Sequence, residues 1–122
     1  MIKELLYVGA GGALGSILRY VVSLAVKSGG TGFPWATFTV NIVGCLVIGL
    51  LFGLTGRNPN FSSHLNLLLA VGLCGGFTTF STFSKECLQL LQTGQHWTCA
   101  LYIIGSIVLG VTATAIGYIL TK

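Results

Sequence analysis

The chain has 122 residues, of which 7% are charged and 53% are hydrophobic, and its mean hydropathy is +0.90. About 25% of the residues in an average soluble domain are charged. Two acidic and six basic residues are too few to cover the surface of a soluble domain of this length. The composition therefore excludes an ordinary soluble domain and indicates an integral membrane protein.

Long stretches without a charged residue predict how the chain crosses the membrane. They cover residues 5–18, 28–56, 58–84 and 87–121. A spanning helix needs about 20 mostly apolar residues, whereas barrel strands are segments of about ten residues with alternating polarity. The stretches are too long and too uniformly apolar for barrel strands, so we expect an all-α integral membrane fold in a single domain over residues 1–122. Its four spans are expected at about residues 5–26, 36–55, 65–91 and 98–120.

The first span contains small residues at helical spacing, Gly11 and Gly15 among them, and glycines recur in the second and fourth spans. Lipid provides little hydrophobic drive for helix association, so close approach through small residues replaces it. Four helices make a thin bundle with little protected interior. We therefore expect a homo-oligomer, and a dimer is the commonest closed form.

Lys and Arg residues are divided evenly between the two expected sides of the membrane. Three lie on the side of the termini and three on the other side: Lys3, Arg57 and Lys122, against Arg19, Lys27 and Lys85. Because the positive-inside rule works through an imbalance of these residues, we interpret the balance as insertion in both orientations, in an antiparallel dual-topology homodimer. The alternative is one fixed orientation that is set by other features.

The second span carries polar side chains inside an apolar helix. Thr37 and Asn41 are four residues apart and share a helix face. An Asn in the middle of a membrane is costly and usually has a partner or a function. Its amide can donate a hydrogen bond to an anion, and the alternative is hydrogen bonding between helices.

The third span contains the segment GGFTTFSTFS at residues 75–84. Glycine costs about 1 kcal/mol relative to alanine inside a helix, and the β-branched Thr78 and Thr79 follow closely after two glycines. We therefore predict that the third helix is broken near residues 75–79. Broken helices expose carbonyls that bind cations, so the carbonyls of Gly75 and Thr78 are candidates to hold a small cation. The alternative is that the glycines only allow tight packing.

Aromatic rings follow the predicted break. Phe80 and Phe83 share a helix face, with Ser81 and Thr82 between them. An aromatic ring is positive at its edge, so ring edges can line a path for an anion without binding it tightly. A deep carboxylate would repel an anion, and Glu86 is expected near the end of its segment.

The fourth span adds hydroxyl donors. Tyr102 and Ser106 are four residues apart, and Thr114 lies further along. In the first span, Arg19 either reaches the membrane interface with its charged end or draws anions toward a vestibule. Hydrogen-bond donors and ring edges without a buried negative charge together predict the passage of a small anion. The composition does not name that anion.

Three motifs carry a resemblance to a known family: GGALGSILRY at residues 11–20, FTVNIVGCLVIG at residues 38–49 and GGFTTFSTFS at residues 75–84. The chain resembles the Fluc family of bacterial fluoride channels, also called CrcB, over nearly its whole length. The resemblance implies an antiparallel dual-topology homodimer with two pores. It also implies passive export of fluoride, in strong preference to chloride, across the bacterial cytoplasmic (inner) membrane, which gives fluoride resistance.

The same resemblance assigns roles to individual residues. It implies a structural sodium ion (Na+) at the dimer centre, held by the backbone carbonyls of Gly75 and Thr78 from both subunits, and a vestibule position for Arg19. The pore and fluoride-binding residues expected from the motifs and from the polar faces are Asn41, Phe80, Phe83, Ser81, Thr82, Tyr102, Ser106, Thr114 and Thr37. The expected partners are fluoride, membrane lipid and a second copy of the chain, with no nucleic acid.

Two other functions stay open from the sequence. A small four-span proton-coupled multidrug transporter needs a titratable carboxylate inside the membrane, but the chain has no Asp, and no Glu is expected at mid-span. A membrane assembly subunit without transport activity would leave the polar residues of the spans unexplained. An enzyme is not expected, because no nucleophile, base and orienting group converge at a readable spacing.

Overall fold

The structure is a computed structural model that describes residues 1–26, 32–57 and 63–122, and every regular element in these ranges is a helix. Four helical stretches are long and apolar enough to cross a membrane: Ile2–Ala25, Trp35–Arg57, Ser63–Gln92 and His96–Thr121. They confirm the expectation of four helical spans. Lys27, one of the six charges used for the orientation, lies outside the described residues.

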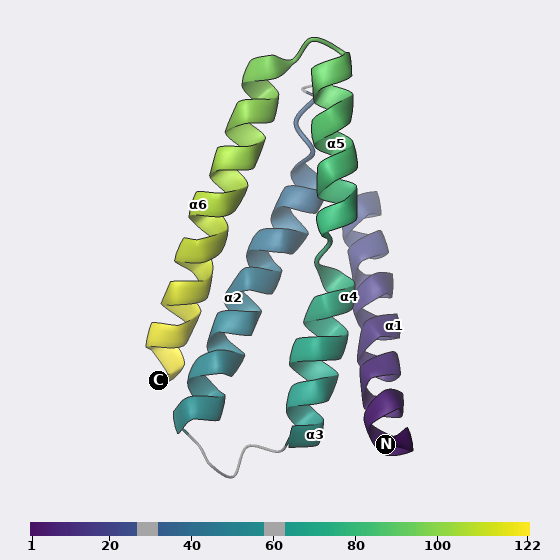
Figure 1. The fold of residues 1–122 in the computed structure, drawn as a ribbon, viewed down its shortest axis with the longest axis vertical. Helices are drawn as coiled ribbons and strands as arrows, with labels where there is room; N and C mark the ends of the chain where they lie inside the picture. Colours follow the sequence, from purple (N-terminus) through teal and green to yellow (C-terminus); the bar gives the residue numbers. More distant parts are fainter. Residues whose placement is uncertain (27–31, 58–62) are drawn as a thin grey trace.

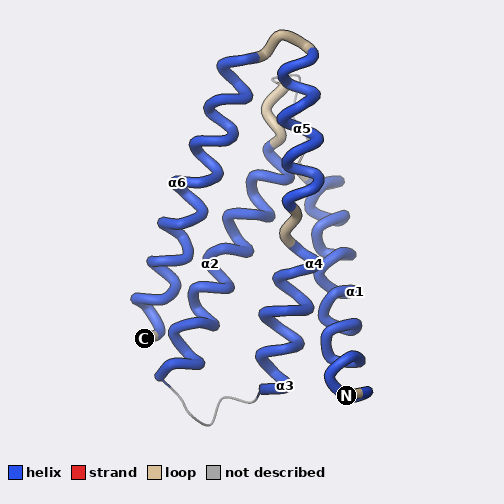
Figure 2. The backbone as a smooth tube through the Cα atoms, in the orientation of Figure 1, coloured by secondary structure: helices blue, strands red, loops and turns tan. Residues whose placement is uncertain are grey.

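Three of the spans are single helices: α1 (Ile2–Ala25), α2 (Trp35–Arg57) and α6 (His96–Thr121). The third span consists of α3 (Ser63–Asn66), a π-helical segment η1 (Leu67–Cys74), α4 (Gly75–Phe77) and α5 (Phe80–Gln92). The spans run along the long axis of the molecule, and both termini lie at the same end (Figure 1). Figure 2 shows the loop that separates α4 from α5 inside the third span.

The α2 and α6 helices pack closely because glycines face the backbone of the opposite helix. A Cβ atom added to Gly117 would lie 2.5 Å from the Leu46 carbonyl oxygen. One added to Gly49 would overlap the Thr114 carbonyl oxygen. This close approach of backbones is the packing that small residues allow in membranes.

The α1 helix packs against η1 and α4 through the small residues of the first span. Gly11 and Gly15 are buried there, and a Cβ atom on either would overlap a carbonyl oxygen of η1. Gly76 of α4 approaches α1 as closely, since its added Cβ would lie 2.5 Å from the Gly12 carbonyl oxygen. The small residues that the sequence places at helical spacing therefore join α1 to the third span of the same chain.

The chain by itself buries few large side chains. Tyr102 is fully buried and Val40 is 1% exposed, whereas large apolar side chains on all four spans are exposed, such as Leu6 and Ile104. Apolar surface of this extent is unfavourable in water. The outer faces are therefore suited to lipid or to another protein surface.

Candidate functional site

A helical interruption lies between α4 and α5. Thr78 has φ −89° and ψ 158°, and Thr79 has φ −153° and ψ 127°, so both residues have extended backbone. Both fall inside the range 75–79 where the sequence predicts a break. The α5 helix then starts at Phe80, and the Thr79 hydroxyl caps its first turn by accepting a hydrogen bond from the Thr82 N–H at 3.3 Å.

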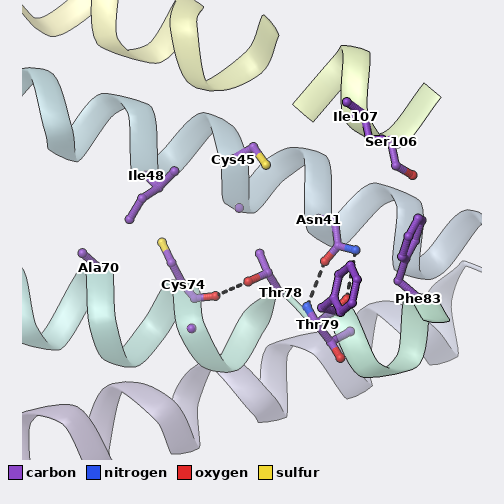
Figure 3. A pocket seen from close by; sticks show the side chains of 13 residues that line it. Asn41, Cys45, Ile48, Ala70, Cys74, Thr78, Thr79, Phe83, Ser106 and Ile107 are labelled. Carbon is purple, nitrogen blue, oxygen red and sulfur yellow. Dashed lines mark hydrogen bonds between the residues drawn. The ribbon is translucent and has the colours of Figure 1, made fainter. Parts of the chain in front are cut away.

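Side chains from α1 and α2 replace hydrogen bonds that the interruption removes. Asn41 Nδ2 donates to the Thr79 carbonyl oxygen at 3.2 Å, and the Thr79 N–H donates to Asn41 Oδ1 at 2.9 Å (Figure 3). Arg19 Nε donates to the Gly76 carbonyl oxygen at 3.1 Å. Backbone polar groups at membrane depth need such partners, because the hydrocarbon region has no water to satisfy them.

The interruption also releases the carbonyl groups of Gly75 and Thr78. A continuous helix would pair the Gly75 carbonyl with the Thr79 N–H, and the Thr78 carbonyl with the Thr82 N–H. In the structure these two N–H groups donate to the side chains of Asn41 and Thr79 instead. Both carbonyls that the sequence nominates as cation ligands are therefore free of helical pairing.

Side-chain ligands for a metal ion are scarce in the parts of the chain that the structure describes. There, no group of three or more His, Cys, Asp or Glu side chains could hold a metal ion. A small cation at the interruption would therefore depend on neutral oxygens, such as those of the backbone carbonyls.

A groove of about 450 Å³ opens beside the interruption, between α2, the third span and α6 (Figure 3). Its lining includes Asn41, Thr78, Phe83 and Ser106, and none of the described residues that line it is charged. The Ser106 hydroxyl is buried, and no described group forms a hydrogen bond with it. Most buried polar groups have a hydrogen-bond partner. Ser106 is therefore a donor that is available to a ligand in the groove.

Two aromatic rings border the groove at the start of α5. The ring centroids of Phe80 and Phe83 lie 5.8 Å apart. Phe80 is 78% exposed, whereas Phe83 is partly buried, with its ring centroid 4.8 Å from that of Tyr102. Both rings line the same groove as Asn41 and Ser106.

A second cavity of about 510 Å³ extends along α6 toward Thr114. Ser106, Cys45 and Ile107 line both cavities, so the two cavities are neighbours. Thr114 Oγ1 donates to the Cys45 carbonyl oxygen at 3.1 Å. The Thr114 hydroxyl therefore has an acceptor in α2, whereas the Ser106 hydroxyl has no hydrogen-bond partner among the described residues.

Glu86 of α5 is a candidate functional residue that the sequence pattern did not reveal. Thr37 Oγ1 donates to Glu86 Oε2 at 3.0 Å, and the Tyr102 hydroxyl donates to Glu86 Oε1 at 2.9 Å. Glu86 lies six residues before Gln92, the last residue of α5, and the expected third span ends at residue 91. The expectation that no carboxyl group lies among the donors is wrong, because two of these donors, Thr37 and Tyr102, donate to Glu86. The available signal was that Glu86 follows Phe83 by three residues and so shares its helix face.

Three expected site residues, Ser81, Thr82 and Arg19, line neither of the two cavities and belong to other contacts than those with Glu86. The hydroxyl oxygens of Ser81 and Thr82 lie 3.3 Å from Thr79 Oγ1, so they belong to the cap of α5. Arg19 lies inside α1 and contacts the Gly76 carbonyl. Its vestibule position stays a prediction.

Comparison with known proteins decides the family. A family model described as CrcB-like protein, Camphor Resistance (CrcB), matches residues 6–118. The chain belongs to the CrcB family. The resemblance indicated by the three motifs is thereby confirmed, because the match extends from the first span to the last.

Relatives of this CrcB chain are similar over nearly their full length. The "Fluoride-specific ion channel FluC" of Phocaeicola vulgatus is 49% identical over 116 residues, which cover 94% of this chain and 95% of the relative. The protein of the same name from Flavobacterium psychrophilum is 49% identical over 98% of both chains. The one from Chlorobaculum tepidum is 44% identical over 100% of this chain and 97% of the relative. Together with the four apolar helices, they show that this CrcB chain is a multi-pass bacterial membrane protein.

The structure gathers most of the predicted residues of this CrcB chain into two neighbouring clusters. The groove brings together Asn41, Phe80, Phe83 and Ser106, and the hydroxyls of Thr37 and Tyr102 meet at Glu86. The ring contact between Phe83 and Tyr102 joins the clusters. Residues from α2, α5 and α6 therefore lie in two clusters that adjoin each other through aromatic rings.

Proposed function

We propose that the chain is a fluoride-selective ion channel that exports fluoride passively across the bacterial cytoplasmic membrane and so relieves fluoride toxicity. The observation that carries this proposal is the uncharged groove in which Asn41, Ser106 and two phenylalanine rings meet. Such a groove offers hydrogen-bond donors and ring edges but no fixed charge. The names of the near-full-length relatives support fluoride as the permeant ion and a channel rather than an enzyme.

The donors of the groove suit an anion that must exchange its water for protein contacts. Fluoride holds its hydration water tightly, so a channel has to replace those hydrogen bonds at several sites that each bind weakly. Ser106 has an unpartnered hydroxyl, and Asn41 has a second amide hydrogen beyond the one donated to Thr79. The edges of Phe80 and Phe83 can add weaker positive contacts.

The Glu86 carboxyl group and its two hydroxyl partners affect how an anion can pass. The hydroxyls of Thr37 and Tyr102 are donors that an anion can use, but both donate to Glu86 in the structure. An anion that passes the cluster therefore competes with the Glu86 carboxyl group for the same two hydrogens. In the proposed channel, the two hydroxyls exchange partners between Glu86 and fluoride as the ion passes.

The proposed channel is an antiparallel dual-topology homodimer with two pores. The groove is open on one side in the single chain, and Phe80 on its border is exposed. A groove open to lipid cannot shelter an anion, because hydrocarbon offers it no hydrogen bonds. A second copy that covers the groove is therefore needed for conduction. The even division of Lys and Arg supports insertion of the two copies in opposite orientations.

A structural sodium ion fits the carbonyls that the interruption releases. Carbonyl oxygens of unwound helical segments coordinate Na+ in membrane proteins, and the helical partners of the Gly75 and Thr78 carbonyls bond elsewhere. In the proposed dimer these two residues of both copies hold the ion. When bound, the ion supplies positive potential beside the pores.

Ion efflux from liposomes that contain the purified full-length protein tests the proposed function. Fluoride and chloride release are recorded separately, with potassium and valinomycin to clamp the voltage and protein-free liposomes to measure leakage. Rapid fluoride release with chloride retained is the expected result. Fluoride release no faster than in protein-free liposomes, from a protein shown to be folded, would refute the channel.

A proton-coupled multidrug transporter is the second candidate, because the structure places Glu86 among hydroxyl groups inside the third span. A titratable carboxyl group at such a position is what proton coupling requires. The same liposomes separate the two candidates. Substrate movement driven by an imposed pH gradient would favour the transporter, whereas fluoride release that follows only the fluoride gradient and the voltage would favour the channel.

A further inference from the structure

Asn41 and Thr79 pair through two hydrogen bonds that run in opposite directions. The side-chain oxygen of Asn41 accepts from the Thr79 N–H at 2.9 Å, and its nitrogen donates to the Thr79 carbonyl oxygen at 3.2 Å (Figure 3). A carboxamide has one carbonyl acceptor and an N–H donor, as a peptide group does. Because Thr79 is extended, the Asn41 side chain forms the two hydrogen bonds that the backbone of a neighbouring β-strand would form.

A helical conformation of Thr79 competes with the extended one. In a continuous helix the Thr79 N–H would donate to the Gly75 carbonyl. At membrane depth no water can take over that bond, so the extended form needs another acceptor. Asn41 provides this acceptor, and it satisfies the Thr79 carbonyl at the same time.

The same face of α2 also makes room for the other extended residue, Thr78. Gly44 lies three residues after Asn41, and a Cβ atom added to it would overlap the Thr78 methyl group. The Thr78 hydroxyl donates back to the Cys74 carbonyl at 2.8 Å, which fixes the direction of its side chain. The α2 helix therefore contacts both extended residues, one through hydrogen bonds and the other through packing.

We propose that Asn41 is a positioning residue that holds the helical interruption open. Its pairing with Thr79 keeps the Thr79 N–H away from the Gly75 carbonyl and so leaves that carbonyl free. The use of the free carbonyl as a sodium ligand rests on the proposed function, whereas the pairing itself does not. This role differs from donation to an anion, for which Asn41 still has its second amide hydrogen.

Nuclear magnetic resonance of the isotope-labelled full-length protein in lipid nanodiscs tests the pairing. In the native protein, the Thr79 N–H should exchange with solvent roughly tenfold more slowly than the N–H of Ser81, as a single hydrogen bond would cause. Ser81 lies in the first turn of α5, where N–H groups have no helical acceptor. Equal exchange rates at Thr79 and Ser81 would overturn the proposal without the need for any variant.

Asn41→Leu removes both hydrogen bonds at similar side-chain volume. The Cα and Cβ chemical shifts of Thr78 and Thr79 should then move from extended toward helical or averaged values. The matched control is Thr121→Val, which removes a hydroxyl bond from α6 to an α2 carbonyl far from the interruption. The control should leave the shifts of Thr78 and Thr79 unchanged.

Fluoride efflux measured on the same variants separates the two roles of Asn41. Loss of efflux in Asn41→Leu with unchanged Thr78 and Thr79 shifts would leave only the anion-donor role and would overturn the positioning role. Changed shifts together with no fluoride efflux from the native protein would refute the proposed channel and still support the positioning role.

Discussion

Two of the contacts that α2 makes differ in what holds the backbones together. Against α6, regular helices approach through Gly49 and Gly117, and the Thr121 hydroxyl adds one hydrogen bond to an α2 carbonyl at 2.8 Å. Against the interruption, Asn41 forms two hydrogen bonds with the backbone of a single residue, Thr79. Close steric fit stabilises the first contact, and hydrogen bonds to backbone groups stabilise the second.

The difference follows from the membrane as a solvent. A regular helix pairs its own backbone groups, so its neighbour only has to fit against it. An interrupted helix loses several of these pairs and depends on polar side chains from other elements. Arg19 of α1 and Asn41 of α2 meet that need at Gly76 and Thr79. Substitutions that add bulk should therefore disturb the contacts between regular helices, whereas substitutions that remove a hydrogen-bonding side chain should disturb the interruption.

The largest effect is expected where the third span meets α1 backbone to backbone. Gly76→Ala would place a Cβ atom 2.5 Å from the Gly12 carbonyl oxygen, and overpacking of this kind costs about 1–3 kcal/mol. Gly9→Ala is the matched control, because a Cβ atom there meets nothing within 4 Å in the chain and Gly9 lies outside the proposed sites. Thermal unfolding in detergent should show a lower midpoint for Gly76→Ala than for Gly9→Ala. Equal midpoints would contradict the α1–α4 contact as the cause.

A smaller loss is expected when the Gly76 carbonyl loses its side-chain partner. Arg19→Met removes the donor at 3.1 Å, and an unsatisfied buried polar group costs about 1–3 kcal/mol, toward the lower end for a partly buried site. Lys122→Met is the control, since it removes a positive charge from the exposed end of the chain. The unfolding midpoint should fall for Arg19→Met alone. A similar fall in both variants would indicate a general effect of charge.

Changes to the rings should act on fluoride transport more than on folding. Phe80→Ile and Phe83→Ile should each reduce fluoride efflux about tenfold, which corresponds to a barrier about 1.4 kcal/mol higher. Phe80→Ile should leave stability nearly unchanged, because the ring is 78% exposed in the chain. Tyr20→Ile, an exposed aromatic position on α1, should leave efflux unchanged. Normal efflux in both phenylalanine variants would remove the rings from the proposed pore.

The smallest effects are expected at the regular α2–α6 contact. Thr121→Val and Thr114→Val each remove one hydroxyl bond to an α2 carbonyl, and interhelical hydrogen bonds in membranes average about 0.6 kcal/mol. Only Thr114 lies on the second cavity, so efflux should fall in Thr114→Val and stay normal in Thr121→Val. A loss of stability as large as that of Arg19→Met, which removes a hydrogen bond to the interruption, would contradict the distinction between steric fit and polar pairing.

Local sequence chemistry explains what could be predicted of the site. Glycines at 75 and 76 followed by β-branched threonines weaken a helix wherever they occur, so the range 75–79 contains the extended residues Thr78 and Thr79. Phe80 and Phe83 could be paired because helical spacing is a local property. Glu86 was misjudged because its partners Thr37 and Tyr102 lie 49 and 16 residues away in the sequence. Nothing local to α5 indicates that hydroxyls from two other helices meet there.

The sequence by itself determined that the chain is helical and that it has four spans, and it predicted a break within residues 75–79 of the third. These properties depend on hydrophobicity and backbone preference, which act over one helical turn or one span. The tertiary structure decided which side chains form hydrogen bonds with the unpaired backbone groups of the interruption. Arg19 reaches Gly76 across 57 residues of sequence, and Asn41 reaches Thr79 across 38. Such pairs depend on how the helices pack, because only the packed bundle brings a side chain of one span to the unpaired backbone of another.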